Sequence, residues 1–389
     1  MSLKDKRVLF YVPNMNALTD GVYHTQVFGL AQYLVRCGAQ CVIIHTDATD
    51  PEGERVVDGV RFWSTAVDAR KVSIFRFPAK LRRLVSPLEP KIKAFAPTHI
   101  YARDSYAGLA ALTLVKKMGA KFVFSCRGAG LAKSDTSLKV RIKEMMLWVV
   151  TWRVLNSADH VSSVCENLRE HLKTFYHCKA PMSVLPCCAM EEKFAIPSEE
   201  NRTALRQALN MPAAAKVVVY CGYIGGYQDG DGIVAMMKAM RDRNPSFVFL
   251  FLTEELNELK NIARRVGLPE GCFRALTCHP SEVASYLHIA TAAFCLRTND
   301  EVTRLCSPIK IGEYLAAGLG VIYSPWIGDM GRLLKSRPFA FAYDGTQAAD
   351  ELVAFVNAID ATKREAGKTF ARSYYSYDGN RGSIEEMFA

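Results

Sequence analysis

The sequence has no apolar stretch of about 18 residues, the length that a helix needs to span a bilayer, so we expect no membrane-spanning helix. It also has no paired Cys-x-x-Cys array, which argues against a zinc-binding module although there are 12 cysteines. Several of these, such as Cys221 and Cys295, stand within apolar runs, where cysteine behaves as a small apolar residue. No signal peptide precedes the first apolar run. We therefore expect a cytoplasmic protein with reduced cysteines.

Acidic residues are outnumbered: 39 Asp and Glu stand against 49 Lys and Arg, for a formal net charge of +10. An excess of positive charge favours an anionic partner, and nucleotide phosphates, anionic lipid and nucleic acid all qualify. The sequence contains no recognisable RNA- or DNA-binding motif, so we expect no nucleic-acid partner. Its 389 residues, half of them hydrophobic, suffice for two or three domains with full-sized cores.

Short apolar runs alternate with amphipathic segments along the chain. From Val27 onward, apolar residues recur at i, i+3, i+4, i+7 and i+8, which predicts a helix that ends at Gly38. Apolar runs of strand length flank this helix, and a strand–helix–strand unit implies a parallel sheet. By the same criteria we predict further helices at 106–118 and 138–156, and further strands at 99–102, 122–125, 161–164, 183–185, 217–221, 247–252, 292–296 and 321–323.

The composition changes around Pro186–Pro212, which is polar and contains several prolines. After it the chain starts again with a strand, a glycine-bearing loop and a helix. We therefore predict two α/β domains, residues 1–195 and 196–367. A helical C-terminal tail, about residues 368–389, is expected to pack back on the first domain.

The segment Ser307–Gly318 combines groups that suit a nucleotide sugar. Pro308 stands near a predicted helix start, where its missing N–H costs nothing and where the unpaired backbone N–H groups favour an anion. Lys310 adds a positive charge for a diphosphate, and Glu313, one helical turn later, can accept two hydrogen bonds from a ribose diol. The alternative is an ordinary exposed i, i+3 ion pair.

This segment resembles the signature of retaining glycosyltransferases of the family-4 type. The first half of the chain is similar to the family as well, at the loop around Gly21 and at Ala158–Val161, so the resemblance covers essentially the whole chain. It implies the α/β GT-B fold, in which two Rossmann-like domains with parallel sheets face each other across a central cleft. It also implies sugar transfer, with retention and without a metal or other cofactor, from a UDP- or GDP-sugar to a hydroxyl of a glycan or lipid-linked acceptor in polysaccharide or cell-surface glycan synthesis.

The resemblance implies roles for individual residues. Glu313 matches the second Glu of the family's Glu-x7-Glu motif, which holds the ribose, while Ser307 and Lys310 match a Ser-Pro-x-Lys turn that touches the diphosphate. Gly21 matches a loop glycine whose backbone approaches the donor, because it has no Cβ. We count Gly222, after the first strand of the second half, as donor-binding with it.

The sequence departs from the family pattern in several places. Leu305 stands where the first Glu of the motif is usual, and Cys126 stands where an acidic residue is frequent. The Arg and Lys usual after the first C-terminal strand are also missing. We therefore predict that Lys310 and Arg304, with Arg297 as a further candidate, stabilise the leaving phosphate, and that Arg127 binds an acceptor or donor oxygen. Solvated loop arginines and surface salt bridges are the alternatives.

Two rival functions stay open beside sugar transfer. One is a nucleotide-sugar epimerase or hydrolase with the same fold, and the other is a non-catalytic, degenerate transferase subunit.

Three further segments have simpler interpretations beside functional ones. Asp229–Gly232 lacks the other ligands of a calcium loop, so an N-cap is the better interpretation. Residues 71–93 are basic and aromatic, which suits either an anionic membrane surface, with the protein peripheral at its inner face, or a solvated helix face. The apolar stretch 141–153 is too short to span a bilayer, and we expect a core helix there rather than an interfacial one.

Overall fold

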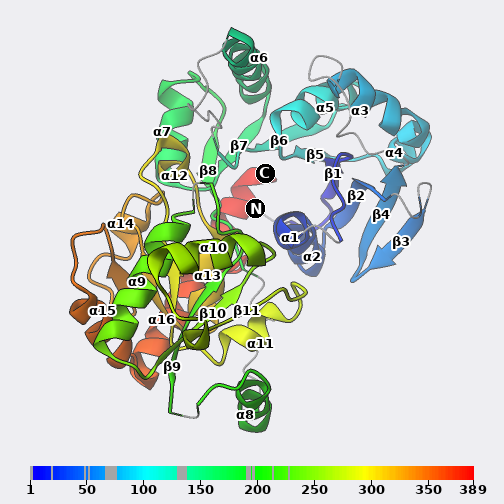
Figure 1. The fold of residues 1–389 in the computed structure, drawn as a ribbon. Coiled ribbons are helices and arrows are strands. Elements are labelled where there is room, and N and C mark those ends of the chain that lie inside the picture. Colours follow the sequence, from blue (N-terminus) through cyan, green and yellow to red (C-terminus); the bar gives the residue numbers. More distant parts are fainter. Residues whose placement is uncertain are drawn as a thin grey trace. The chain divides into compact units, whose positions relative to one another are not determined.

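The computed structural model describes residues 3–18, 21–47, 50, 53–65, 77–128, 138–189, 194, 198–212, 214–226 and 228–389 (Figure 1). The chain divides into two compact units, which are treated separately below. Unit 1 comprises Met1–Cys188 and Asn380–Ala389, and unit 2 comprises Ala189–Gly379. Each unit is built around one sheet.

Unit 1 contains an eight-stranded sheet in the order β3-β4-β2-β1-β5-β6-β7-β8. All neighbouring strands are parallel except β3 and β4, which form an antiparallel hairpin at one edge. Asp58 and Gly59 turn this hairpin with φ values of 48° and 78°, the positive pair that a tight hairpin turn requires. The strands are β1 (Arg7–Val12), β2 (Gln40–Thr46), β3 (Glu54–Val57), β4 (Val60–Thr65), β5 (His99–Ala102), β6 (Lys121–Ser125), β7 (His160–Ser163) and β8 (Met182–Val184).

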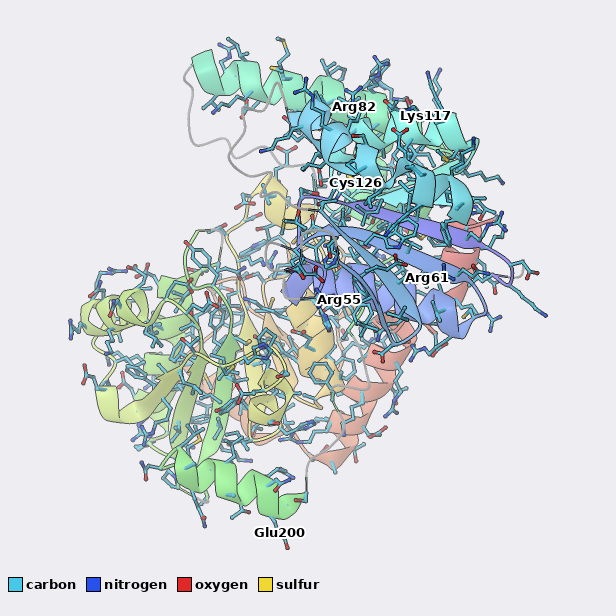
Figure 2. The ribbon with its side chains drawn as sticks, turned by 90° about the vertical axis from the view of Figure 1, so that its right-hand side faces the viewer. Arg55, Arg61, Arg82, Lys117, Cys126 and Glu200 are labelled. Carbon is cyan, nitrogen blue, oxygen red and sulfur yellow. The ribbon has the colours of Figure 1, made fainter. Side chains whose placement is uncertain are left out.

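The first helical stretch of unit 1 changes its hydrogen-bonding pattern within three turns. It begins as α1 (Gly21–Tyr23), continues as the π-helix η1 (His24–Phe28) and ends as α2 (Gly29–Arg36). The remaining helices of the unit are α3 (Phe77–Val85), η3 (Ser86–Leu88), α4 (Glu89–Phe95), α5 (Ser105–Met118), α6 (Leu138–Leu155), α7 (Glu166–Thr174) and α17 (Arg381–Met387). Charged side chains such as Arg82 and Lys117 lie on the outer helices, whereas Cys126 is buried (Figure 2).

Unit 2 contains a six-stranded sheet in the order β11-β10-β9-β12-β13-β14, parallel throughout. Successive residues of β9 enter different cores: Val217 and Val219 pack with α13 and α16, whereas Val218 and Tyr220 pack with α9, α10 and α15. Helices thus cover both faces, which is why the central strands are apolar without alternation. The strands are β9 (Lys216–Cys221), β10 (Phe247–Leu252), β11 (Phe273–Leu276), β12 (Ala292–Cys295), β13 (Gly320–Tyr323) and β14 (Ala340–Ala342).

Short helices connect these strands. They are α8 (Glu199–Ala208), α9 (Gly230–Arg243), α10 (Leu256–Val266), η5 (Glu270–Cys272), α11 (Val283–Leu287), α12 (Glu301–Arg304), α13 (Ile309–Ala316), α14 (Met330–Leu333), α15 (Ala349–Asn357) and α16 (Ala361–Tyr374). The predicted parallel α/β architecture and the eight listed strands are confirmed, with ends that shift by a residue at most. The segment Pro186–Pro212, at which the composition changes, also contains α8, which Ser198 caps by accepting a hydrogen bond from the Asn201 N–H (3.2 Å).

The C-terminal tail differs from the single helix that we predicted. It consists of α16, which packs against α13 in unit 2, and α17, which packs against β7 and β8 in unit 1. Helix α16 ends at Tyr374, and the ring of the next residue, Tyr375, is buried in the unit 2 core. At Gly379 the backbone passes so close that a Cβ would lie 2.4 Å from the Ser373 carbonyl oxygen.

The prediction that α6 is a core helix is wrong for most of its length. Thr151, Val154 and Leu155 are buried, but Met145 is 62% and Val149 49% exposed. Apolar residues recur around the whole helix, between several charged ones, while the described part of the unit covers only one side of it. Among the described residues, no helix is both long enough and apolar enough to cross a membrane.

Candidate functional sites

Helix α13 carries the residues that we predicted to bind a nucleotide. Pro308 is its N-cap, and Ser307, just before it, is buried. Ile311 and Leu315 enter the unit 2 core, which anchors the helix and leaves its other side, with Lys310 and Glu313, only partly buried. The predicted helix start at Pro308 is therefore confirmed, and the two charged residues lie one turn apart on it.

The ammonium group of Lys310 occupies a prepared position at the end of β9. Its Nζ donates to the Tyr220 hydroxyl oxygen at 3.3 Å and lies 4.7 Å from the centre of the Tyr220 ring. Tyr220 in turn donates to the backbone carbonyl oxygen of Tyr223, so its oxygen is oriented to accept from the lysine. The Lys310 ammonium group over the Tyr220 ring also makes a cation–π interaction. The end of β9 therefore holds Lys310 in place. An ordinary exposed ion pair between Lys310 and Glu313 would not explain these contacts.

Gly222 permits this approach. Its φ is +111°, and a Cβ at this position would lie 2.8 Å from both Cε and Nζ of Lys310. Any other residue would be strained and would also displace the lysine. One further contact fixes the strand end to α13: the Cys221 backbone N–H donates to the Tyr314 hydroxyl at 3.1 Å. The predicted donor residues Gly222 and Lys310 are thus in direct contact.

The charge of Glu313 acts on groups at the same strand end. The pKa of the Cys221 thiol is raised to about 12, chiefly by burial and also by the Glu313 carboxylate, while Lys310 opposes both effects. Burial also lowers the pKa of Lys310, and the neighbouring Arg297 acts in the same direction while Glu313 acts against it. Lys310 thus lies at the carboxyl end of β9, where ligands bind in open α/β sheets, and the charge of Glu313 acts on the same place.

The two loop arginines have different surroundings. Arg297 is buried, and hydrogen bonds fix its backbone: its N–H donates to Ser324 Oγ (3.0 Å), and its carbonyl oxygen accepts from Trp326 Nε1 (2.8 Å) and from Ser324 Oγ (3.3 Å). Arg304 is exposed at the end of α12 and donates twice to the Asn299 side-chain oxygen, at 3.0 and 2.8 Å. The structure thus brings Arg297 close to Lys310, while Arg304 remains a candidate at the surface.

Three other residues singled out from the sequence have clear local roles. Leu305 is buried and ends α12, and Gly21 is exposed, begins α1 and accepts from Thr25 Oγ1 (2.9 Å). Asp229 accepts from the Gly232 N–H (3.0 Å), which confirms the N-cap interpretation. Within the described part of the chain, no group of three His, Cys, Asp or Glu side chains is arranged to hold a metal ion.

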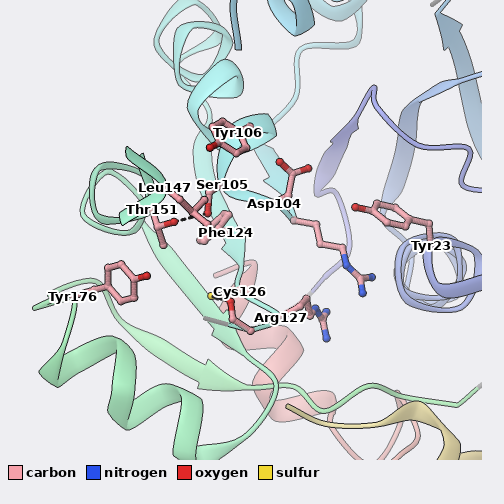
Figure 3. A pocket seen from close by; sticks show the side chains of 12 residues that line it. Tyr23, Asp104, Ser105, Tyr106, Phe124, Cys126, Arg127, Leu147, Thr151 and Tyr176 are labelled. Atoms are coloured by element: carbon pink, nitrogen blue, oxygen red, sulfur yellow. Dashed lines mark hydrogen bonds between the residues drawn. The ribbon is translucent and has the colours of Figure 1, made fainter. Parts of the chain in front are cut away.

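A separate pocket of about 300 Å³ lies in unit 1, at the carboxyl ends of β5 and β6 (Figure 3). Its wall includes Arg103, Asp104 and Arg127, together with aromatic and hydroxyl side chains from α5, α6 and α1. Cys126 also lines it, and burial raises the pKa of this thiol to about 11, so it is not acidic. This is the region where the sequence placed Arg127 at a strand end.

Three of the contacts that Arg127 makes in this pocket are long. Its guanidinium donates to the Tyr101 hydroxyl at 3.4 Å, to the Leu185 carbonyl oxygen at 3.4 Å and to Gln26 Oε1 at 3.5 Å. These lie beyond the usual N–H···O range of about 2.7–3.2 Å. Arg103 is more deeply buried than Arg127. It follows β5 as Arg127 follows β6, and from the sequence this parallel makes Arg103 a weaker candidate of the same kind.

Comparisons with known proteins agree with this architecture. Residues 23–188 match the family model described as a glycosyl transferase 4-like domain. The comparison with curated proteins found no significant match. Among solved structures, sucrose-phosphate synthase from Thermosynechococcus elongatus is 14% identical, with a TM-score of 0.77, and the match covers 99% of this chain and 98% of that chain.

Two further solved structures are similar over the same length. A glycosyltransferase from Rickettsia africae is 15% identical with a TM-score of 0.70, and HepE from Anabaena in complex with UDP is 14% identical with a TM-score of 0.67. Each match covers 98% of both chains. Residues 23–188 of the present chain thus match the glycosyl transferase 4-like domain, and the chain as a whole has the GT-B fold of glycosyltransferases.

Proposed function

We propose that this protein transfers a sugar, with retention, from a UDP- or GDP-sugar to a hydroxyl group of a glycan or lipid-linked acceptor in polysaccharide or cell-surface glycan synthesis. The observation that carries the proposal is the position of the Lys310 ammonium, held against Gly222 and Tyr220 beside the start of α13, with Glu313 one turn further on. The same fold binds UDP and UDP-glucose in HepE.

The proposed chemistry divides the donor between two side chains. Lys310 and the first turn of α13 bind the diphosphate, and Glu313 accepts hydrogen bonds from the ribose hydroxyls. When the glycosidic bond to phosphate breaks, the leaving oxygen takes the negative charge and accepts the proton of the attacking hydroxyl. No protein nucleophile and no metal ion is needed in this scheme, so catalysis consists of positioning and charge stabilisation. Leu305 and Cys126, where acids are usual, are compatible with it.

Glu313→Ala tests the nucleotide site. We expect the dissociation constant of the preferred nucleotide to rise about tenfold to a hundredfold, because charge-assisted hydrogen bonds contribute about 1.5–3 kcal/mol. The measurement is calorimetric titration of each variant with UDP and with GDP. Glu258→Ala, which removes an exposed acid on α10 of the same unit, is the matched control and should bind like the wild type. Wild-type affinity in Glu313→Ala would contradict the assignment.

Product analysis separates transfer from the rival functions. Incubation with donor alone should leave the sugar attached, and an added acceptor should give a glycoside. Isomerised donor sugar, or free sugar formed at the same rate without acceptor, would indicate an epimerase or hydrolase, and no turnover with any acceptor would indicate a degenerate subunit.

We further propose that the protein lies at an anionic membrane surface through α6. Ile142, Met145, Val149 and Trp152 project from one side of this helix and are 41%, 62%, 49% and 42% exposed. Arg141, Lys143 and Arg153 are exposed around them. Apolar side chains flanked by basic ones suit the boundary between headgroups and acyl chains.

The basic segment that we first associated with a membrane gives weaker support. Its residues 71–76 lie outside the described part of the chain. Of the remainder, Lys91 pairs with Glu54 at 3.0 Å, so its charge is already compensated. Arg82 and Arg83 of α3 are exposed and remain compatible with a solvated helix face.

Replacing Met145 and Val149 together by Glu tests the membrane proposal. Two carboxylates in the apolar face should reduce the fraction of protein bound to vesicles at least tenfold, because burial of each apolar side chain contributes about 1.5–3 kcal/mol. Flotation with vesicles of phosphatidylglycerol and of phosphatidylcholine measures this. Val56→Glu, at an equally exposed valine on β3, is the control. Absence of wild-type binding to anionic vesicles, or unchanged binding of the double variant, would refute the proposal.

A further inference from the structure

Arg103 is a buried cation whose hydrogen-bonding capacity is not used. The side chain lines the unit 1 pocket and is 8% exposed. Its guanidinium lies 5.0 Å from the centre of the Tyr23 ring, and its Nη1 atom is buried without a hydrogen-bond partner. A buried charged group without such partners is costly, since desolvation is then uncompensated. The buried guanidinium of Arg103 therefore needs a compensating interaction.

A second guanidinium, that of Arg127, belongs to the lining of the same pocket. Burial lowers the pKa of Arg103, and the positive charge of Arg127 lowers it further. Two like charges at the edge of one small pocket repel each other, and an anion between them would remove both penalties. Arginine presents a planar fork of N–H donors that fits a phosphate or carboxylate with two parallel hydrogen bonds.

The acid beside these arginines is occupied elsewhere. Asp104 caps α5 by accepting from the Ala107 N–H (2.8 Å), and its other oxygen accepts from Asn14 Nδ2 (3.2 Å). One carboxylate beside two guanidinium groups leaves the pocket with an excess of positive charge. Figure 3 shows the Asp104 carboxylate and the Arg127 guanidinium at separate positions along the wall.

The first helical stretch positions one contact for each arginine. Tyr23, at the end of α1, provides the ring beside Arg103, and Gln26 of the π-helix η1 directs its Oε1 toward Arg127 (3.5 Å). The Gln26 orientation is fixed because its Nε2 donates to the Cys188 carbonyl oxygen at 2.8 Å. π-helical turns are frequent at functional sites, where they aim particular side chains.

The remaining wall suits a sugar. Tyr106 and Tyr176 offer aromatic rings with hydroxyl groups. Ser105 and Thr151 offer aliphatic hydroxyls, which are joined by a hydrogen bond of 2.8 Å (Figure 3). A volume of about 300 Å³ is at the lower end of small-molecule pockets and corresponds to a ligand of about monosaccharide size.

We infer that the unit 1 pocket binds an anionic monosaccharide unit of the acceptor and that Arg103 and Arg127 hold its phosphate or carboxylate group. This inference rests on the proposed transferase function, of which it names the acceptor class. The donor site in unit 2 contains neither arginine, so the two assignments are tested by different ligands.

The test is a calorimetric titration of the full chain with glucose 6-phosphate, glucuronate and glucose. We expect the better of the two anionic sugars to bind at least tenfold more tightly than glucose, and comparison of the two shows whether phosphate or carboxylate is preferred. Arg127→Gln should lose about tenfold to a hundredfold of that affinity, while UDP binding stays unchanged. Arg61→Gln, at an exposed arginine on β4 of the same unit, should bind every ligand like the wild type.

Because Arg103 is deeply buried, loss of binding in one variant alone would not be distinguished from misfolding. Two variants of Arg103 are therefore compared with each other. Arg103→Lys keeps the charge but not the fork, so it should retain more anion affinity than Arg103→Gln at similar thermal stability. Equal affinity of the wild type for glucose and for both anionic sugars would overturn the inference, as would full anion affinity in Arg127→Gln. If the wild type binds UDP normally, each of these two results contradicts only the acceptor pocket and not the proposed donor site. If the wild type does not bind UDP, the proposed function itself is contradicted.

Discussion

Lys310→Met should lower the catalytic efficiency of sugar transfer about a hundredfold to a thousandfold, the usual cost of removing one preorganised group that stabilises a developing negative charge. Methionine keeps most of the length of the side chain, so packing beside Tyr220 is largely retained. The charge is lost at the point where the leaving diphosphate acquires it. The measurement is kcat/KM for transfer, together with the dissociation constant of UDP, since an interaction formed mainly in the transition state lowers kcat more than it weakens ground-state binding.

The pH dependence gives a second readout for the same residue. Because burial lowers the pKa of Lys310, its positive charge is lost at a lower pH than that of an exposed lysine. UDP affinity of the wild type should therefore fall as the pH rises through this lowered pKa, and Lys310→Met should lack that step. Lys260→Met, on the exposed side of α10, is the control for the loss of one positive charge. Full transfer activity in Lys310→Met would exclude a role in catalysis.

The elements that the sequence predicted correctly depend on local patterns. The run of six apolar residues at Phe247–Leu252 became β10 with the predicted bounds, because a strand buried on both faces requires apolar residues at every position. The cap at Asp229 was predictable for a similar reason, since the side-chain acceptor and the orphan N–H group are three residues apart. The Asp58–Gly59 turn is also a local pattern and could have predicted the β3–β4 hairpin that we missed.

The features that the sequence did not predict depend on distant parts of the chain. Whether α6 is buried depends on how much of its surface the neighbouring helices cover, and its composition alone favours a core position. Lys310 appeared from spacing alone to be equally compatible with an exposed pair. Its actual position depends on Tyr220 and Gly222, about ninety residues earlier, which provide its hydrogen-bond acceptor and the space for its ammonium group.

Gly222→Ala should disable donor binding although it removes no polar group. Alanine at a φ of +111° is strained by about 1–3 kcal/mol, and its Cβ would lie 2.8 Å from Lys310 Nζ. The lysine is the flexible partner, so it should move away from Tyr220 and from the site proposed for the diphosphate. We expect UDP affinity to fall at least tenfold, because a charge-assisted hydrogen bond contributes about 1.5–3 kcal/mol.

Gly345→Ala separates displacement of the lysine from backbone strain. Gly345 has a similar φ of +97°, and a Cβ there would meet no atom within 4 Å. Both variants should lose thermal stability to a comparable extent, whereas only Gly222→Ala should lose UDP affinity. An equal loss of affinity in both would mean that strain in unit 2 is sufficient to disturb the site. Unchanged affinity in Gly222→Ala would mean that the Lys310 position beside β9 is not the one used to bind the nucleotide, because the substitution cannot leave that ammonium group where it lies now.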